Sequence, residues 1–298
     1  MNSTFTTIDP NSISTRELHG ILLTAVAPRP IAFASTVDKN GLVNLSPFSF
    51  FNVFSANPPI LIFSPARRVR DNTTKHTLEN VKATNEVVIN IVNHSIVEQM
   101  SLASTEYDKG VDEFKKSGLT PIASNKIKPP RVLESPVAFE CVVDDIIELG
   151  KEGGAGNLII SRVVNIHINN HYFNDSNQLD TEKLDLVARL GASWYTRVTS
   201  NSLFEIPKPL LTKGIGVDAL PKHAQNSTIL TGNNLGRLGN LANLPSSTEI
   251  EKLKSNSEVA QILTISNDVE KTKKLHKLAQ TCLDNGDLEK SLAILFCY

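Results

Sequence analysis

The feature that most constrains the fold of this chain is a series of strand-like segments that do not alternate regularly with helices. Runs of β-branched and aromatic residues bounded by turn residues occupy positions 59–64, 86–92, 137–149 and 158–168. Parallel strands need a crossover helix between them, whereas antiparallel strands can be joined by short turns. The sequence therefore predicts a mainly β fold, an antiparallel barrel or sandwich with helical insertions, rather than a doubly wound parallel sheet.

Local signals predict one hairpin and the ends of several helices. Residues 31–37 and 42–45 flank Lys39-Asn40-Gly41, whose residue types tolerate the positive φ angles of a tight hairpin turn. In a capping box, a hydroxyl accepts from one free amide of a helix start and a carboxylate accepts from another. Such boxes occur at 14–17, 95–98 and 246–249, and Gly118 suits the left-handed residue that ends a helix.

The character of the chain changes near residue 200. Four prolines between 207 and 245, with asparagine and glycine through 231–243, predict an irregular arm, and amphipathic helical segments follow from 246. We therefore expect a first domain over 1–200 and an extension over 201–298, an arm followed by a helical tail. The tail would expose an apolar stripe if its helices stood free, so we expect them to pack outside the barrel.

Composition excludes several classes of protein. The formal net charge is -1, with 30 Lys plus Arg against 31 Asp plus Glu, so no electrostatic footprint for nucleic acid or an anionic membrane is present. Apolar runs fall far short of the roughly 18 residues that a membrane helix needs. The first seven residues carry no basic region or apolar stretch, so a cytoplasmic location is expected. Three widely spaced cysteines predict buried or inert thiols rather than a disulfide framework.

Several motif-like patterns lack the features that would make them functional. The glycine-rich run 150–156 has no terminal Gly-Lys-Ser/Thr for a phosphate, and glycines 232, 236 and 239 are wrongly spaced for a dinucleotide fingerprint. His167 and His171 would lie about 13 Å apart on a strand, too far to share a zinc ion. No hydrolase signature is present, so neither a metal site nor a catalytic side chain is predicted.

Residues 28–80 concentrate the groups that could bind a ligand. Hydroxyls, an amide and exposed backbone lie beside three phenylalanines in 44–52, a mixture that suits a flat aromatic ligand with polar edges. Arginines at 67, 68 and 70 precede Lys75-His76-Thr77 at a helix start, where free amides, cations and a hydroxyl suit a phosphate. Composition alone equally allows a phenylalanine-lined core strand followed by a solvated basic loop.

The combination of these segments resembles one protein family. Residues 27–33, 44–52, 58–59, 75–80, 90–92, 160–164 and 188–195 match, in order and spacing, the flavin reductase-like proteins of the FMN-binding split-barrel fold. The resemblance covers residues 15 to 200 and implies a six-stranded antiparallel Greek-key split barrel. It also implies a homodimer with the flavin in a groove between protomers. The family's phosphate box usually reads Lys-Asp-Thr, and here His76 replaces the acid.

The resemblance also implies the roles of individual residues toward FMN. Lys75 with Thr77 would hold the phosphate, Ser35 and Thr36 would reach the ribityl chain or the phosphate, and Arg29 would serve the cofactor or the dimer contact. The isoalloxazine edge would meet amides and side chains from one segment, comprising Ser46, Pro47, Phe48, Ser49 and Asn52.

Three functions remain open for a chain with these features. The leading hypothesis is an NAD(P)H-dependent flavin reductase in which hydride passes to the flavin N5, because flavin chemistry needs alignment more than a general acid. The second is an FMN-holding electron carrier that takes electrons from another protein. The third is a split barrel that has become an interaction or regulatory module. Bleaching of bound flavin by NAD(P)H alone would separate the first two.

Overall fold

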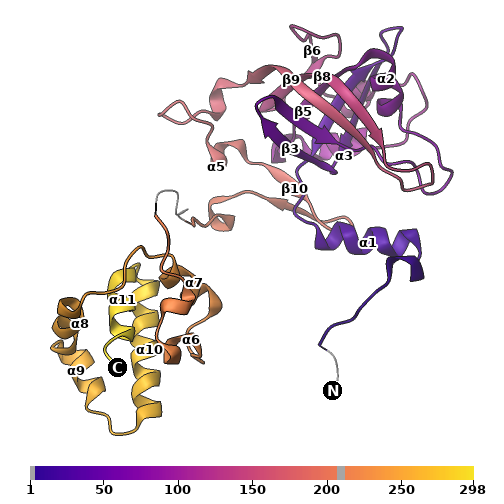
Figure 1. Ribbon diagram of the computed structural model, residues 1–298. Coiled ribbons are helices and arrows are strands. Elements are labelled where there is room, and N and C mark those ends of the chain that lie inside the picture. The colour runs from indigo at the N-terminus through magenta and orange to yellow at the C-terminus, as the bar shows by residue number, and fades with distance from the viewer. Residues whose placement is uncertain (1–3, 207–211) are drawn as a thin grey trace. The chain divides into compact units, whose positions relative to one another are not determined.

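The computed structural model describes residues 4–206 and 212–298, so residues 207–211 of the expected arm, with Pro207 and Pro209, lie outside the described residues. The chain divides into two compact units, Met1–Phe204 and Glu205–Tyr298. Strands are concentrated in the first unit and helices in the second (Figure 1). They are called the barrel unit and the helical unit below.

An antiparallel sheet forms the barrel unit. Its spatial order is β2-β1-β5-β8-β9-β4-β3. In chain order its strands are β1 (Ala32–Val37), β2 (Val43–Phe48), β3 (Phe51–Ala56), β4 (Pro59–Phe63), β5 (Glu86–Ile91), β8 (Val137–Glu148) and β9 (Asn157–Ile168). Two short pairs lie outside it, β6 (Pro121–Ile122) with β7 (Arg131–Val132) and β10 (Val187–Arg189) with β11 (Tyr195–Arg197). The predicted antiparallel fold is confirmed, and the main sheet of the described residues has seven strands where six were expected.

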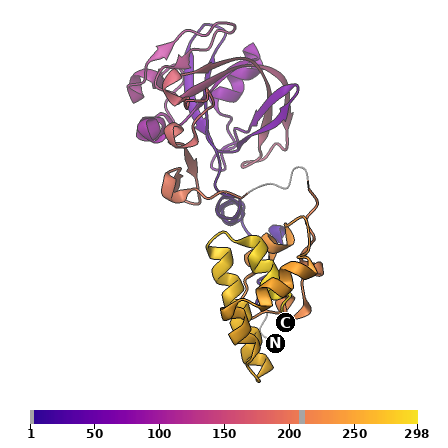
Figure 2. The same cartoon turned by 90° about the vertical axis from the view of Figure 1, so that its left-hand side faces the viewer.

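The two edge strands of this sheet are neighbours in sequence. β2 ends at Phe48 and β3 begins at Phe51, yet these strands stand at opposite ends of the sheet. Because the two connecting residues, Ser49 and Phe50, span only about 7 Å, the sheet must curl until its edges approach. Figure 2 shows the sheet wrapped around itself. The two edges do not pair with each other, which makes this a split barrel.

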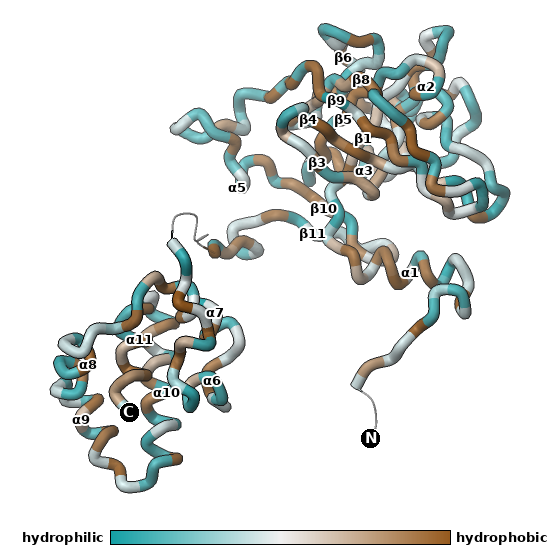
Figure 3. Tube along the Cα trace, in the orientation of Figure 1, coloured by the Kyte–Doolittle hydropathy of each residue, from teal (hydrophilic) through white to brown (hydrophobic). Residues whose placement is uncertain are grey.

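Helices cover both faces of β1 and its neighbours. α2 (His76–Thr84) connects β4 to β5 and places Leu78 in a core cluster with Ala32. α3 (Val97–Ala103) and α4 (Glu113–Ser117) place Met100 and Phe114 against Phe33 on the opposite face. Every residue of β1 is therefore buried, and Figure 3 shows hydrophobic residues concentrated along the sheet.

The local signals for helix ends mostly hold in the barrel unit. The box at 14–17 is present at the start of α1 (Thr15–Ala25), and Gly118 ends α4 with a φ of 68°. The box predicted at 95–98 is wrong, because residues 94–96 form a turn of 3-10 helix and α3 begins only at Val97. Ser95 Oγ instead donates to Asn93 Oδ1 at 2.7 Å, which leaves it unavailable as a cap. The remaining helix of this unit is α5 (Thr181–Leu184).

The helical unit begins to form helices earlier than the sequence predicts. Its helices are α6 (Lys222–Gln225), α7 (Gly232–Gly239), α8 (Ser247–Lys254), α9 (Ser257–Leu263), α10 (Asp268–Asp284) and α11 (Leu288–Leu295). The first two lie in the segment predicted to be an irregular arm. Thr231 and Asn234 form a capping box at α7, and Leu238 is fully buried, so a cap and tertiary packing overcome the low helix propensity of three glycines. The predicted capping box at 246–249 begins α8.

The apolar residues of the tail are buried within their own unit. Leu292 and Leu295 of α11 join Leu275 of α10 and Leu238 of α7 in one core cluster. The sequence argument for packing against the barrel assumed that this stripe had no partner inside the extension. The helical unit supplies that partner itself, so the stripe gives no reason to expect docking on the barrel.

No helix among the described residues combines the length and apolar character needed to cross a membrane.

Candidate functional site

A small polar pocket lies at the start of α2. β2, the loop before α2, the end of α3 with its following loop, and the start of α4 all contribute to it. Its cavity measures about 20 Å³, which is room for little more than one water molecule. It is lined by Asn44, Ser46, Arg68, Lys75, His76, Thr77, Ala103, Ser104, Thr105, Glu106, Tyr107 and Glu113.

The start of α2 at this pocket has no side-chain cap. Lys75 occupies the N-cap position and makes no capping hydrogen bond, whereas α1, α4, α7 and α8 begin with Ser, Asp or Thr side chains that accept from helix amides. The first amides of a helix have no partner within it and carry partial positive charge. Thr77, which is 1% exposed, accepts a hydrogen bond from Asn44 Nδ2 at 2.9 Å. The strand β2 is thereby tied to the helix start.

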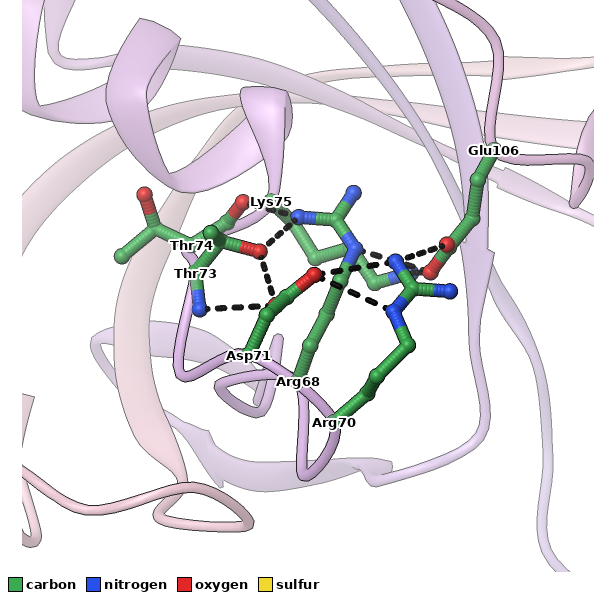
Figure 4. Close-up of polar contacts among 7 residues, drawn as sticks. All are labelled: Arg68, Arg70, Asp71, Thr73, Thr74, Lys75 and Glu106. Atoms are coloured by element: carbon green, nitrogen blue, oxygen red, sulfur yellow. Dashed lines mark hydrogen bonds and ion pairs between the residues drawn. The ribbon is translucent and has the colours of Figure 1, made fainter.

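Three cations converge beside the helix start. Glu106 Oε1 lies 2.8 Å from Arg68 Nε and 3.2 Å from Lys75 Nζ, and Glu106 Oε2 lies 3.1 Å from Arg70 Nη2. Figure 4 shows Glu106 reaching these cations from a separate segment of the chain. Hydrogen bonds from Arg68 and Lys75 lower the pKa of Glu106 to about 2, so this carboxylate is charged at neutral pH.

A second carboxylate shapes the loop that carries these cations. Asp71 accepts from Thr73 Oγ1 at 2.6 Å and pairs with Arg70 at 3.0 Å. The hydrogen bond from the Thr73 hydroxyl is the main reason why the pKa of Asp71 falls to about 2. The acidic groups beside residues 75–77 therefore come from positions 71 and 106, while position 76 carries a histidine that lines the pocket.

Glu113 is a buried carboxyl group on another side of the pocket. It is 5% exposed, and its Oε2 accepts from the Leu45 backbone amide at 3.1 Å. Burial raises the pKa of Glu113 above its ordinary value. The pocket thus combines a strongly ionised carboxylate beside cations with a carboxyl group whose charged form is disfavoured.

The structure brings some of the predicted FMN-binding residues together at this pocket. Ser46, Lys75 and Thr77 all line it. Ser35 and Thr36 are fully buried in β1 instead. Thr36 Oγ1 accepts from Asn80 Nδ2 of α2 at 3.1 Å, and Ser35 Oγ has no hydrogen-bond partner among the described residues.

The other predicted residues lie on or beside the segment that closes the barrel. Arg29 is 6% exposed and donates to the backbone oxygens of Leu23, Val26 and Leu190, and to Ser49 Oγ at 3.4 Å. Arg29 therefore ties the end of α1 and the residue that follows β10 to Ser49. Burial lowers its pKa relative to an exposed arginine.

Within this segment, side chains range from buried to exposed. The ring of Phe48 is buried and packs on Phe63 with 5.5 Å between centroids, while Pro47 is half-buried. Asn52 is exposed on the edge strand β3, and its Oδ1 accepts from the Val53 amide at 2.8 Å. Ser46 at the pocket and Asn52 thus belong to one continuous segment that runs from the cation cluster to the open barrel edge.

Sequence reasoning missed both acidic residues of the pocket. Glu106 follows α3 in a loop, and Glu113 lies in the first turn of α4, so neither belongs to a motif with a fixed spacing from Lys75. The contact of Lys75 with Glu106 spans 31 positions and that of Leu45 with Glu113 spans 68. No periodicity in the sequence reports contacts at such separations.

Buried histidines outside the pocket make polar pairs. In the helical unit, His276 is 3% exposed. Its Nε2 lies 2.9 Å from His223 Nδ1, and its Nδ1 lies 2.8 Å from Ser227 Oγ. In the barrel unit, His167 lies 2.5 Å from the fully buried Glu140. No cluster of potential metal ligands with three or more members occurs in residues 4–206 and 212–298.

Comparison with known proteins matches the barrel unit. Residues 25–181 match the family model described as a flavin reductase like domain. A protein from Halalkalibacterium halodurans is 35% identical over 208 residues, which cover 69% of this chain and 98% of that protein. The family match ends before the helical unit begins.

Solved structures agree with this match. Nitrilotriacetate monooxygenase component B from Bacillus cereus has a TM-score of 0.64 and is 30% identical; the match covers 69% of this chain and 100% of that one. A protein of flavin reductase type with a split barrel domain, from Shewanella frigidimarina, has a TM-score of 0.56 and 28% identity, over 66% of this chain and 95% of that one.

Proposed function

The chain belongs to the flavin reductase like family, and from that premise we propose that it is an FMN-binding oxidoreductase that takes electrons from NAD(P)H. The observation that carries the proposal is the uncapped start of α2 with Arg68 and Lys75 beside it. That pocket also holds Ser46, the first residue of the segment that runs to the barrel edge. An anionic head group and a flat polar ring system could therefore be held by one stretch of chain.

The phosphate end of FMN fits the groups at the helix start. Free amides of the first turn, the Lys75 ammonium and the Arg68 guanidinium all favour an anion. Thr77 is held in place by Asn44, and Thr36 bonds to Asn80 in the same helix, so β1 and β2 both fix the position of α2. We assign Lys75 and Thr77 to direct phosphate contact. Thr36 is a positioning residue, which acts on the site through α2.

The ring end of FMN fits the segment from Ser46 to Asn52. Pro47 removes one backbone donor and restricts Ser46 to an extended conformation, while Phe48 anchors the segment in the core. Arg29 holds Ser49, and Asn52 is exposed beyond it. Because β2 and β3 are the edge strands of the sheet, the backbone groups on their unpaired side can meet the polar edge of a ring system without a large ordering cost.

The protein's contribution to the reaction is orientation. Hydride transfer from NAD(P)H to N5 of a bound flavin is chemistry that the cofactor supplies. The chain has only to align the two rings and exclude water, so the proposal assigns no side chain as a general acid or base. This agrees with a site whose fixed groups are amides, hydroxyls and cations.

Exposed apolar residues support a homodimer with the flavin between protomers. α1 has no buried residue, and its Leu22 and Val26 are 49% and 64% exposed. On the edge strand β3, Val53 and Phe54 are 63% and 64% exposed. Exposed apolar side chains of this size are typical of surfaces covered by another chain. We propose that a second copy covers them.

An absorbance titration tests the proposed function. The purified protein, mixed with FMN and freed of unbound ligand, should keep bands near about 370 and 450 nm, because a held flavin retains its chromophore. Anaerobic addition of NADH or NADPH should then bleach the longer-wavelength band. Retained flavin without bleaching would favour the electron carrier fed by a protein partner. Failure to retain or bind any flavin would contradict the proposal and favour an interaction module.

A further inference from the structure

The carboxylate of Glu106 occupies the centre of the cation cluster. Its two oxygens contact Arg68, Arg70 and Lys75 at 2.8, 3.1 and 3.2 Å. Charge-assisted contacts from several cations to the oxygens of one anion are the arrangement by which proteins bind phosphate groups. Figure 4 shows the two guanidinium groups and the lysine turned toward this one side chain.

The pocket with Glu106 in place is too small for a phosphate group. Its cavity of about 20 Å³ holds little more than a single water molecule. The cations that would attract a phosphate are neutralised in part, because Glu106 and Asp71 together place two negative charges among Arg68, Arg70 and Lys75. A phosphate that is to take the position between these three cations must therefore displace the Glu106 side chain.

We propose that Glu106 is the internal occupant of an anion site and competes with the phosphate monoester of the ligand. The proposal rests on the proposed function in one respect, the identity of that ligand as FMN. When the phosphate binds, the Glu106 carboxylate exchanges its contact with Lys75 for water, and the phosphate takes its place. Glu106 thus lowers the affinity for phosphate-bearing ligands without touching the ring system.

Contacts that do not involve Glu106 show why its removal strengthens binding rather than disordering the site. Arg68 Nη1 also donates to Thr73 Oγ1 at 2.9 Å and to the Thr74 backbone oxygen at 2.5 Å. Arg70 also pairs with Asp71. Both arginines therefore keep anchors within their own loop when Glu106 leaves. Lys75 has no other ion pair with residues 4–206 or 212–298 and becomes available to the ligand.

Glu106 is also placed so that it can leave. Its side chain is 41% exposed, in the loop that follows α3. Its side-chain contacts among the described residues are those with the three cations. Moving it into solvent breaks no packing contact of the core. Because Glu106 lies partly in solvent, its ion pairs are screened and can yield to a dianion.

The test compares two ligands and two variants that remove one negative charge. Glu106→Gln keeps the shape of the side chain, and Glu98→Gln is the matched control, because Glu98 is exposed on α3 and contacts none of the cations. FMN and riboflavin, which lacks the phosphate, are titrated into each protein. Loss of the competing charge should tighten FMN binding by roughly tenfold in Glu106→Gln. Riboflavin binding to both variants, and FMN binding to Glu98→Gln, should match the unmodified protein.

Two results would overturn the proposal. Weaker or unchanged FMN binding in Glu106→Gln would show that Glu106 organises the cations or lies apart from the ligand. Equal tightening for FMN and riboflavin would show an effect that does not act through the phosphate. Circular dichroism of each variant checks that it is folded. Glu106→Asp keeps the negative charge and should bind FMN nearly as the unmodified protein does.

A third probe separates this proposal from the proposed function. Inorganic phosphate is titrated calorimetrically into the unmodified protein and Glu106→Gln. If neither flavin binds to the unmodified protein, the assignment of FMN fails, yet stronger phosphate binding by Glu106→Gln would still support Glu106 as the internal occupant. Equal phosphate binding by the two proteins would then overturn the Glu106 proposal as well.

Discussion

The two units of this chain differ in where they keep their charged and polar side chains. In the barrel unit, Arg68, Lys75 and Glu106 meet at a pocket open to solvent. In the helical unit, His276 and His223 satisfy each other inside the protein, beside an apolar core. Groups that pair with one another in a core add to stability, whereas cations held at an open pocket can exchange partners. We therefore place the proposed ligand chemistry in the barrel unit, and describe the helical unit as a compact unit with its own core.

The largest expected effect of a single substitution is on the helical unit alone. Leu275 is fully buried in its core, so Leu275→Ala should lower the free energy of unfolding of this unit by about 2–5 kcal/mol. Loss of helical signal in far-ultraviolet circular dichroism would report this unit. Hydrogen exchange of the buried strand β1 would report the barrel unit, because Trp194 is 74% exposed and its surroundings change little on unfolding. A matching loss of stability in both signals would show that the units unfold together.

A second expected effect is a loss of stability in the helical unit that begins near pH 6.5, above the range in which the ion-paired carboxylates of the barrel unit take up protons. Burial, with a smaller contribution from His223, lowers the pKa of His276 from 6.5 to about 4. The folded state therefore holds His276 neutral, while the unfolded state gains a proton below pH 6.5, so stability is complete above this pH and falls as the pH drops toward 4. The loss amounts to about 3 kcal/mol.

Unfolding by urea at several pH values measures this effect. His276→Gln should flatten the pH dependence of the helical unit between pH 6.5 and 4, whatever it does to overall stability. Between about pH 6.5 and 5, where its ion-paired carboxylates stay ionised in the folded and unfolded states, the barrel unit serves as an internal control through hydrogen exchange of β1. An unchanged slope in His276→Gln would assign the pH dependence to other groups.

A third expected effect is on ligand binding by the barrel unit. Lys75→Ala removes a cation from the proposed phosphate site, so FMN affinity should fall about 10- to 100-fold, the equivalent of one charged hydrogen bond. Riboflavin affinity should change much less. Lys39→Ala, in an exposed hairpin turn, removes the same charge away from the pocket and should bind FMN normally. Full FMN affinity in Lys75→Ala would refute the phosphate assignment.

The smallest expected effect is the change in FMN affinity when the helical unit is removed. A protein ending at Phe204 lacks the helical unit but keeps every residue assigned to the flavin. Its FMN affinity should stay within about twofold of the full chain, as expected for independent sites. Equilibrium dialysis of both proteins at equal concentration would measure this. A truncated protein that is folded and dimeric but binds no FMN would show that the helical unit helps to build the site.

Much of the barrel unit could be predicted from its sequence, because its signals are local. The hairpin turn has its glycine at a φ of 82° at Gly41, the box at 14–17 caps α1, and Gly118 ends α4. The helical unit was predicted less well. Asparagine and glycine in 231–243 indicated an arm, whereas α7 forms because Leu238 is buried in a core supplied by later helices. Propensity is a weak prior, and tertiary packing decided this segment.

The sequence by itself determined the strands of the main sheet other than β3, most helix ends, the family and the basic segment at 67–77, because each depends on neighbouring residues or on a motif of fixed spacing. Only the tertiary structure decided which carboxylates face those cations. It also decided the contacts of Arg29, which bonds to Ser49 and to the backbone oxygen of Leu190, 161 positions away in the sequence. Closure of the barrel brings β2, α2 and the loop after α3 together. Such contacts follow from the path of the whole sheet, and no local pattern of residues encodes them.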